Sequence, residues 1–222
     1  MLKLFKIVTL LTIFSFNIAL AQNVAINSED ARIWCENNGK ALLQTLSLSS
    51  HTEKQAKLDE MMDKHVNLDY ISKFVMGRYY KRMNNAQKNR YTQVFRRYIL
   101  SIYKQFNLKI NEDDISFKVD KIIEKNNHTI ASILIDITNL TKSTEKQVIP
   151  VEFKLIRGAK NRIQTADLVI SNISLVVEYR KRFNKMILNE EGDIDWFLDK
   201  LEDITRANEE NFGRKNLRNL QI

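Results

Sequence analysis

The spacing of apolar residues changes near Asn111, and this change limits the possible folds more than any other feature. Before Asn111, apolar side chains recur every three or four residues, which is typical of amphipathic helices. After it, apolar and polar side chains alternate in four runs, 115–124, 129–138, 147–157 and 162–170. The connections between these runs are too short for crossover helices, so an antiparallel meander is expected. The sequence therefore predicts an α+β fold with helices packed on a four-stranded antiparallel sheet.

Four helices are predicted ahead of the sheet. The first follows a cap at Asn27 or Ser28, the second opens with a capping box at Thr52, and the third follows a cap at Asp69. The fourth, 86–106, is the clearest, because its apolar and aromatic residues fall on a single face. Its other face carries a row of cations that is either solvated or available for docking to a membrane surface or a partner: Lys88, Arg90, Arg96, Arg97 and Lys104.

The stretch 162–187 joins the last strand to a further helix through the small polar pair Ser171–Asn172. Tyr179, Arg180 and Phe183 lie within about one turn of each other on that helix. The stretch carries no nucleophile, metal cluster or phosphate loop. We therefore interpret it as a binding wall rather than a reaction centre.

The N-terminus has the pattern of a secretory signal peptide. Lys3 and Lys6 precede an apolar run, 7–18, and Ala19-Leu20-Ala21 forms an A-x-A cleavage site. An N-terminal membrane anchor is the alternative, but the apolar run is shorter than the roughly 20 residues that span a bilayer. Removing residues 1–21 of 222 leaves 201 residues and lowers the formal charge from +8 to +6.

The remaining chain has no linker rich in Gly or Pro. Residues 22–205 are therefore predicted to form a single domain, or two intertwined subdomains, that ends with a helix starting at Gly192–Asp193. The polar residues 206–222 are predicted to form a largely disordered tail. Cys35 is the only cysteine, so no internal disulfide forms, and it is either a buried apolar residue or a reactive thiol.

Residues that carry chemistry are few. His51, His65 and His128 lack the spacing of a zinc site, and the five glycines form no phosphate-binding loop. Acidic residues cluster where the last helix begins, and the helix macrodipole explains them better than paired-carboxylate catalysis does: Glu190, Glu191, Asp193 and Asp195. The sequence therefore predicts no catalytic residue, metal, cofactor or nucleic-acid partner, and the protein is not expected to be an enzyme. Its positive charge is compatible with anionic lipid surfaces.

Three stretches carry a resemblance to a known family. Residues 67–80 read NLDYISKFVMGRYY and precede Ala86-Gln87 and the long helix, 148–153 read VIPVEF, and 167–183 read DLVISNISLVVEYRKRF. They resemble, in order, the D-x-x-x-x-A-x-x-V-L-G-R-Y-W motif with its T-x-x-Q, the I-P-V-D-Y strand and the D-V-x-V-E-G-V-S-L-V-x-N-Y-R-x-x-F signature. These belong to the MlaC family, also called the toluene-tolerance or Ttg2 auxiliary family.

The match departs from the family pattern mainly around the turn. Ser171 and Asn172 replace the usual Glu-Gly, Glu178 replaces Asn, and the segment 160–166 lacks the Trp that usually comes before the Asp. The segment 192–201 resembles the closing helix of the family.

The resemblance implies a periplasmic phospholipid carrier that performs no chemistry. Such proteins hold acyl chains in an apolar cavity between a curved antiparallel sheet and helices, with the head group outside. They shuttle lipid between an outer-membrane lipoprotein complex and an inner-membrane ABC transporter with an MCE-type subunit, which are the expected partners here. The expected cargo is phospholipid, the expected location is the periplasm, and the protein is expected to be monomeric.

The predicted lipid-binding residues come from the long helices, one face of the sheet and the stretch 162–187, and each of them is equally suited to an ordinary core. They are Phe74, Val75, Phe95, Ile99, Tyr103, Val151, Phe153, Leu155, Val169, Ile173, Leu175, Val176, Tyr179 and Phe183. Arg78 and Arg180 are expected near a head group or a docking surface, or else as exposed or structurally paired arginines.

Two other functions are kept open by the sequence. An envelope adaptor with a filled core would bind proteins through the basic face of the helix 86–106 and would carry no lipid. A periplasmic hydrolase would need an unrecognised site, for which Asp167 is the residue to test.

Overall fold

The computed structural model describes residues 25–104 and 111–219, with only the backbone described at 103–104, 112 and 212–219. The predicted signal peptide therefore lies outside the described residues. In chain order the elements are α2 (Ser28–Ser47), α3 (His51–His65), α4 (Leu68–Met76), α5 (Arg78–Arg82), α6 (Asn85–Lys104), η1 (Glu112–Asp114), β1 (Ser116–Glu124), β2 (Thr129–Asp136), α7 (Thr138–Thr141), β3 (Val148–Arg157), η2 (Ala159–Asn161), β4 (Ile163–Ile170), β5 (Ile173–Ser174), α8 (Leu175–Asn189) and α9 (Ile194–Asn219).

The strands form one antiparallel sheet in chain order, β1-β2-β3-β4-β5, which confirms the predicted α+β class and the meander. The sheet has five strands rather than the predicted four. The extra strand, β5, has two residues, which is too short for alternation to reveal it in the sequence. It folds back on β4 through Ser171 and Asn172, whose φ angles are 49° and 66°. Positive φ at both positions is typical of a two-residue hairpin loop, and Asn tolerates it well.

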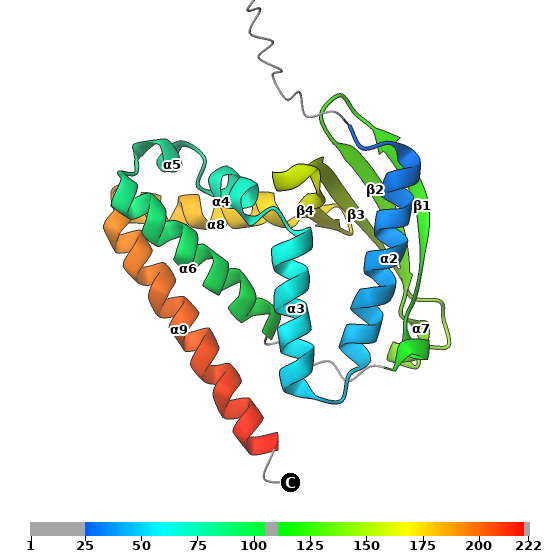
Figure 1. Cartoon of the computed structure of the whole chain (residues 1–222). Coiled ribbons are helices and arrows are strands. Elements are labelled where there is room, and N and C mark those ends of the chain that lie inside the picture. The colour runs from blue at the N-terminus through cyan, green and yellow to red at the C-terminus, as the bar shows by residue number, and fades with distance from the viewer. Residues whose placement is uncertain (1–24, 105–110, 220–222) are drawn as a thin grey trace, which may run out of the picture.

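The helix α2 packs across β1 and β2 (Figure 1). Ala31 and Cys35 of α2 are buried against Ala131, Ile133 and Leu155 of the sheet, and we call this group the sheet core. The close approach has a local cause. A Cβ on Gly39 would lie 2.3 Å from the Phe117 ring, so only glycine leaves room for that ring beneath α2.

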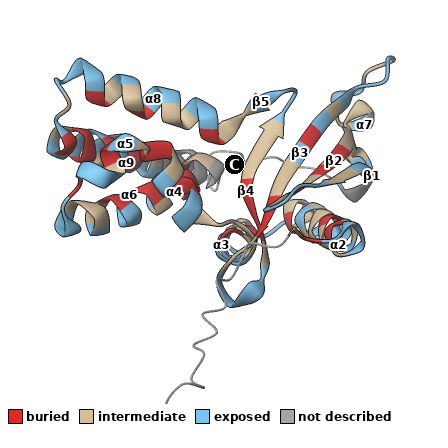
Figure 2. Cartoon of the chain, turned by 90° about the horizontal axis from the view of Figure 1, so that it is seen from above, coloured by how far each residue is buried: buried red, intermediate tan, exposed pale blue. Residues whose placement is uncertain are grey.

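A second apolar cluster, the helical core, lies among α4, α6, α8 and α9. These helices gather on one side of the molecule, and the sheet with α2 lies on the other (Figure 2). The two clusters share no buried residue among those that the structure describes. The strand β4 contacts α3, α4 and α8, and it thus links the sheet to the helices.

Two predicted helix caps were wrong by two residues. The side chain of Ser50, not Thr52, caps α3 and accepts from the Glu53 N–H. The side-chain oxygen of Asn67, not that of Asp69, caps α4 and accepts from the Tyr70 N–H. Asp69 instead lies in the first turn of α4 and pairs with Lys73, four residues on.

Two short helices, α5 and α7, also escaped prediction. Gly77, with φ of 53°, ends α4 and lets the five-residue helix α5 start at once. The helix α7 begins at the last residue of the predicted run 129–138 and fills the start of the connection to the next run. Helices this short carry too few residues to show a period.

The backbone of α9 is helical through Asn219, so the prediction of a largely disordered tail from Arg206 was wrong for 206–219. Tertiary contacts compensate for the polar composition. Thr205 is buried, the Asn208 amide donates to the Ser101 hydroxyl at 3.1 Å, and Glu209 pairs with Arg97 at 2.7 Å. These contacts hold the helix against α6 beyond the last apolar turn.

Candidate functional site

Several predicted lipid-binding residues lie inside the helical core. Val75, Phe95, Ile99, Val176 and Phe183 are between 0% and 7% exposed. The Phe183 ring packs against four other rings at centroid distances of 5.0 to 6.4 Å: Phe95, Tyr98, Tyr179 and Phe197. Packing of this kind fills the space between the helices, so these residues serve the core in this structure.

The sheet residues of the prediction divide between two faces. Val151 and Leu155 are buried and Phe153 is half-buried on the face that α2 covers. Val169 pairs with Glu152, however, and residues paired across antiparallel strands share a face. Val169 therefore lies on the opposite face from Val151, Phe153 and Leu155, and grouping it with them was wrong.

The residues of β4 that share the inner face are Leu168, which pairs with Phe153, and Ile170, which pairs with Val151. The sequence analysis missed both, although their alternation with Val169 was visible. Leu168 is half-buried and Ile170 is 36% exposed. Because α2 packs on β1 and β2, this half of the inner face keeps apolar side chains only partly covered.

The remaining predicted lining residues are less enclosed. Phe74 and Tyr179 pack against the helical core from its edge, and Leu175 is half-buried. Ile173 is 54% exposed, beside the hairpin turn. The side chain of Tyr103 lies outside the described part of the chain.

The turn between β4 and α8 is held by Asp167. Its carboxylate accepts from the Ser174 hydroxyl at 2.6 Å and from the backbone N–H groups of Leu168 and Val176 at 2.8 and 3.2 Å. Ser174 in turn caps α8 by accepting from the Val177 N–H at 3.1 Å. These contacts fix the orientation of α8 relative to β4.

A pocket of about 500 Å³ opens between α4, α5 and α8, and we call it the cationic pocket. Its lining residues are Tyr70, Lys73, Phe74, Gly77, Arg78, Lys81 and Arg180. Two stretches of the family resemblance, 67–80 and 167–183, meet here. The pocket also brings together the two arginines that the sequence singled out, Arg78 and Arg180. The residues that the sequence analysis missed, Tyr70, Lys73 and Lys81, repeat every three or four positions with Phe74 and Gly77, which is the available signal.

Arg180 is seated between an aromatic ring and a glycine. Its guanidinium carbon lies 5.0 Å from the centroid of the Phe74 ring, within the range of a cation–π contact. Phe74 in turn stacks on Tyr70 at 6.4 Å. A Cβ on Gly77 would lie 2.9 Å from Arg180 Nη2, so glycine at this position admits the guanidinium.

Three cations of this pocket form no ion pair with any carboxylate that the structure describes: Arg78, Lys81 and Arg180. Lys73 is the exception, since it pairs with Asp69 at 2.7 Å, and this contact raises the lysine pKa. Arg78 donates to the Tyr79 hydroxyl at 3.1 Å, which leaves its charge uncompensated. The pocket thus concentrates positive charge over an aromatic floor.

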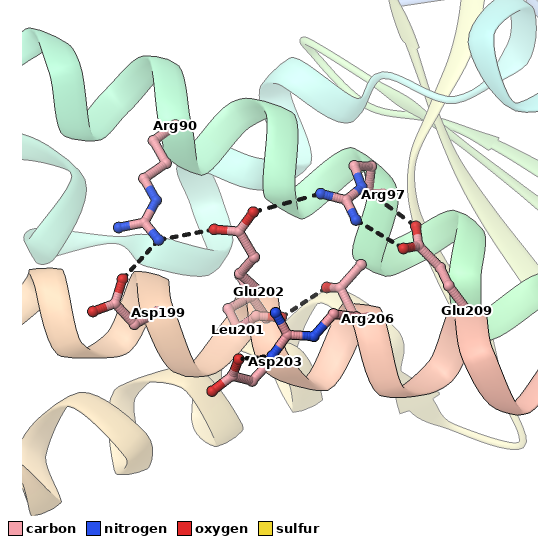
Figure 3. Close-up of polar contacts among 9 residues, drawn as sticks. Arg90, Arg97, Asp199, Leu201, Glu202, Asp203, Arg206 and Glu209 are labelled. Atoms are coloured by element: carbon pink, nitrogen blue, oxygen red, sulfur yellow. Dashed lines mark hydrogen bonds and ion pairs between the residues drawn. The ribbon is translucent and has the colours of Figure 1, made fainter.

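The arginines of α6 are in the opposite state. Arg90 pairs with Asp199 and Glu202, and Arg97 pairs with Glu202 and Glu209, all on α9 (Figure 3). The carboxylates raise the pKa of both arginines by accepting their hydrogen bonds. Both side chains keep part of their surface in water, at 39% and 44% exposed, but their charges are paired within the protein rather than free for docking.

Arg96, on the same helix, makes a two-pronged contact with Asp63 of α3 at 2.7 to 3.1 Å. Lys88 lies over the Tyr80 ring at 5.6 Å, and the Lys104 side chain lies outside the described part. The basic row that an adaptor would present is therefore largely engaged within the protein itself.

Other chemistry is sparse in the described residues. They contain no group of three or more His, Cys, Asp or Glu side chains that could hold a metal ion. None of their helices has the length and apolar character needed to cross a membrane. A second pocket, of about 270 Å³, lies between α2 and α3 and is lined by residues such as Asn38, Gln44 and His65.

Comparison with known proteins agrees with this architecture. Residues 38–203 match the model of the MlaC protein family. The fold is similar to that of a phospholipid-binding protein from Ralstonia solanacearum, solved in complex with a phospholipid. The TM-score is 0.63 at 12% sequence identity, and the match covers 80% of this chain and 98% of the other. No curated protein matches the sequence.

The family match spans more than half of the chain and includes α4, β3 and the β4–α8 stretch, whose residues build the cationic pocket and the inner face of the sheet. From these observations, the chain belongs to the MlaC family.

Proposed function

We propose that this protein is a periplasmic phospholipid carrier that moves lipid between the two membranes of the envelope without chemical reaction. The observation that supports it most is the family match over 38–203 together with a fold shared with a protein solved in complex with a phospholipid. The A-x-A pattern at 19–21 supports export to the periplasm.

The physical requirement on such a carrier is a balance. Burying about 30 methylenes of a two-chain lipid is worth about 24 kcal/mol at about 0.8 kcal/mol each. A carrier must offer nearly as apolar an environment as the bilayer, since otherwise lipid does not leave the membrane. It must not bind much more tightly, since otherwise lipid is not released.

The acyl chains lie, in this proposal, against the β3–β4 half of the inner sheet face. This half carries Phe153, Leu168 and Ile170, which are apolar and only partly covered. Val176 at the start of α8 and Ile99 in α6 are buried in the helical core. The sheet core and helical core remain separately packed, so a lipid can enter or leave without dismantling either.

The partners follow from the same proposal. A carrier in the periplasm receives lipid from one membrane complex and delivers it to another, which here are an outer-membrane lipoprotein complex and an inner-membrane ABC transporter with an MCE-type subunit. The arginines Arg90 and Arg97 are engaged with α9, so contacts with these partners would use other surfaces.

Lipid uptake from vesicles provides the test, with two neighbouring residues as a matched pair. Leu168 and Val169 are both half-buried but lie on opposite faces of β4. We expect Leu168→Gln to reduce lipid bound per protein about tenfold, because it places an amide against the acyl chains. Val169→Gln should keep uptake near the wild-type level. Equal uptake by both variants would show that the lipid lies elsewhere, and no uptake by the wild type would refute the carrier function.

A further inference from the structure

The helix α8 has an exposed stripe that belongs to neither core. Val177, Lys181, Lys185 and Leu188 are spaced by four, four and three residues, so they lie on one side of the helix. All four are exposed, whereas Phe183, on the other side, is 1% exposed in the helical core. We call these four residues the outer stripe. Figure 2 shows the exposed side of α8 along one edge of the molecule.

Exposed apolar side chains gather at the two ends of this stripe. Leu188, near the end of α8, is 57% exposed, and Ile173, two residues before the helix begins, is 54% exposed. These are the highest values for any large apolar side chain in the part of the chain that the structure describes. Val177 and Ile170 extend the same region and are also exposed. Several exposed apolar side chains along one surface, rather than single ones, mark a site of interaction.

The sequence around the hairpin turn is uncharged although the turn faces water. Residues 168–177 contain no charged side chain, in a chain in which 28% of the residues are charged. The turn residues 171–173 are nevertheless exposed. Lys181 and Lys185 follow about one and two turns after Val177. An apolar end followed by lysines on the same face is typical of a helix that lies in the interface of a bilayer.

The composition of the outer stripe favours lipid over a protein partner. The cores of protein interfaces are enriched in aromatic residues, Met and Arg and depleted in Lys, whereas this stripe has two lysines, a valine and a leucine. A lysine lays its methylene stem along hydrocarbon while its ammonium group reaches the lipid phosphates.

The positive charge of the stripe is available to such phosphates. Lys185 forms no ion pair with any carboxylate that the structure describes. Lys181 pairs with Glu178 at 2.7 Å, but both side chains are exposed, and an exposed pair of this kind is weak. The next acid along the chain, Glu190, lies about 140° away from Val177 around the helix.

We propose that the outer stripe, together with Ile173 at the hairpin, docks α8 on the surface of an anionic phospholipid bilayer. This inference rests on the proposed carrier function and names the bilayer itself as a direct partner. Ile173 pairs with Ile170, which pairs with Val151 on the inner face of the sheet. A helix lying on the bilayer therefore brings the hairpin end of the proposed acyl-chain face to the membrane surface.

Co-flotation with vesicles measures this docking. The full mature chain would be mixed with protein-free vesicles of phosphatidylethanolamine and phosphatidylglycerol, and in parallel with vesicles of phosphatidylcholine alone. The wild type should bind the anionic vesicles more tightly, and added salt should weaken this binding. Lys181→Gln combined with Lys185→Gln should weaken it about 25-fold, which is about fivefold per lysine. Leu188→Gln should weaken it about fivefold, because the apolar side chain no longer enters the hydrocarbon region.

Matched controls make the same changes on the sheet side of the molecule, away from α8 (Figures 1 and 2). Lys118→Gln combined with Lys121→Gln removes two exposed lysines from β1 and so lowers the net charge equally. Ile33→Gln changes an exposed apolar residue of α2. Both controls should bind vesicles as the wild type does.

A dye at single positions gives a second readout that does not depend on affinity. Cys35 is buried, so an environment-sensitive thiol dye added to the folded Leu188→Cys protein reacts at one site. On anionic vesicles the emission of the dye should shift to the blue in Leu188→Cys. It should stay unchanged in Ile33→Cys.

The outcomes separate the two proposals. A wild type that takes up lipid from cyclodextrin but does not bind vesicles, or equal vesicle binding by the wild type and all variants, would refute the docking face and leave the carrier function standing. Binding to native envelope membranes, but not to protein-free vesicles of the same lipids, would also refute it, because the stripe would then contact a protein. Vesicle binding that the stripe variants weaken, in a protein that takes up no lipid, would support the docking face and refute the carrier function.

Discussion

Truncation of Phe183 to alanine distinguishes a filled helical core from an open lipid cavity. Phe183 is 1% exposed and its ring contacts four other aromatic rings. The sequence placed it on the wall of a cavity, whereas the structure surrounds it with side chains. Truncating a residue inside a filled core lowers the free energy of unfolding far more than truncating a residue on the wall of an open cavity.

The expected cost follows from the packing. Replacing a buried phenylalanine by alanine in a rigid core lowers the free energy of unfolding by about 3–5 kcal/mol, because apolar burial is lost and a cavity remains. The ring pairs at 5.0 to 6.4 Å favour the upper part of this range. The free energy of unfolding of a typical protein is about 5–15 kcal/mol, so this loss is a large part of it. The variant should still fold if the wild type lies near the upper end of that range.

Urea unfolding of delipidated protein measures the effect. Leu188→Ala, on the same helix but 57% exposed, is the control and should change the free energy of unfolding by less than about 0.5 kcal/mol. The reasoning would be refuted if Phe183→Ala cost no more than about 1 kcal/mol and also raised lipid uptake. That result would make Phe183 part of the lipid cavity.

Three further predictions concern single polar groups. Asp167→Ala should lower the free energy of unfolding by about 1–3 kcal/mol, because the Ser174 hydroxyl and the N–H groups of Leu168 and Val176 lose their acceptor. Amide exchange at Leu168 and Val176 should become faster, and unchanged exchange would contradict this. Burial raises the pKa of the Cys35 thiol to about 12, so Ellman's reagent at pH 8 should react only after unfolding in urea, and rapid labelling of native protein would contradict the burial. Burial, with the charge of Lys64, lowers the pKa of His65 below 6.5, so the unfolded chain binds more protons than the folded protein. The free energy of unfolding should therefore fall as the pH drops through 6.5. His65→Phe should make this fall shallower, and parallel curves of stability against pH for the two proteins would contradict the shift.

The periodicity of the sequence was enough to predict the fold class, because amphipathic helices and alternating strands are long enough here to show their period. Four strands were placed within about two residues of their observed ends. The two-residue strand β5 and the five-residue helix α5 were missed because neither is long enough for its period to recur.

Side-chain positions within the site were harder to predict. Whether Val169 or Leu168 lies on the same face as Phe153 depends on the register between β3 and β4, which shifts near Lys154 and Leu155. A register shift of this kind reverses the faces of a strand and leaves no mark in composition.

The arginines of α6 illustrate a second limit. The sequence showed Arg90 and Arg97 on a polar face, but their partners lie more than 100 residues away on α9. Only the tertiary contact reveals that this face is neutralised, and the same contact explains why the polar segment after Arg206 is helical. The pocket arginines, Arg78 and Arg180, were singled out on the strength of two motifs that the fold then brings together.

The central claim, that this protein carries phospholipid, is tested most directly by the lipid content of the protein itself. The mature chain would be purified without detergent from an envelope fraction and its bound lipid identified and counted by mass spectrometry. We expect stoichiometric phospholipid, with less of it in Leu168→Gln than in Val169→Gln. Protein recovered without phospholipid, and unable to take it up from vesicles, would contradict the account.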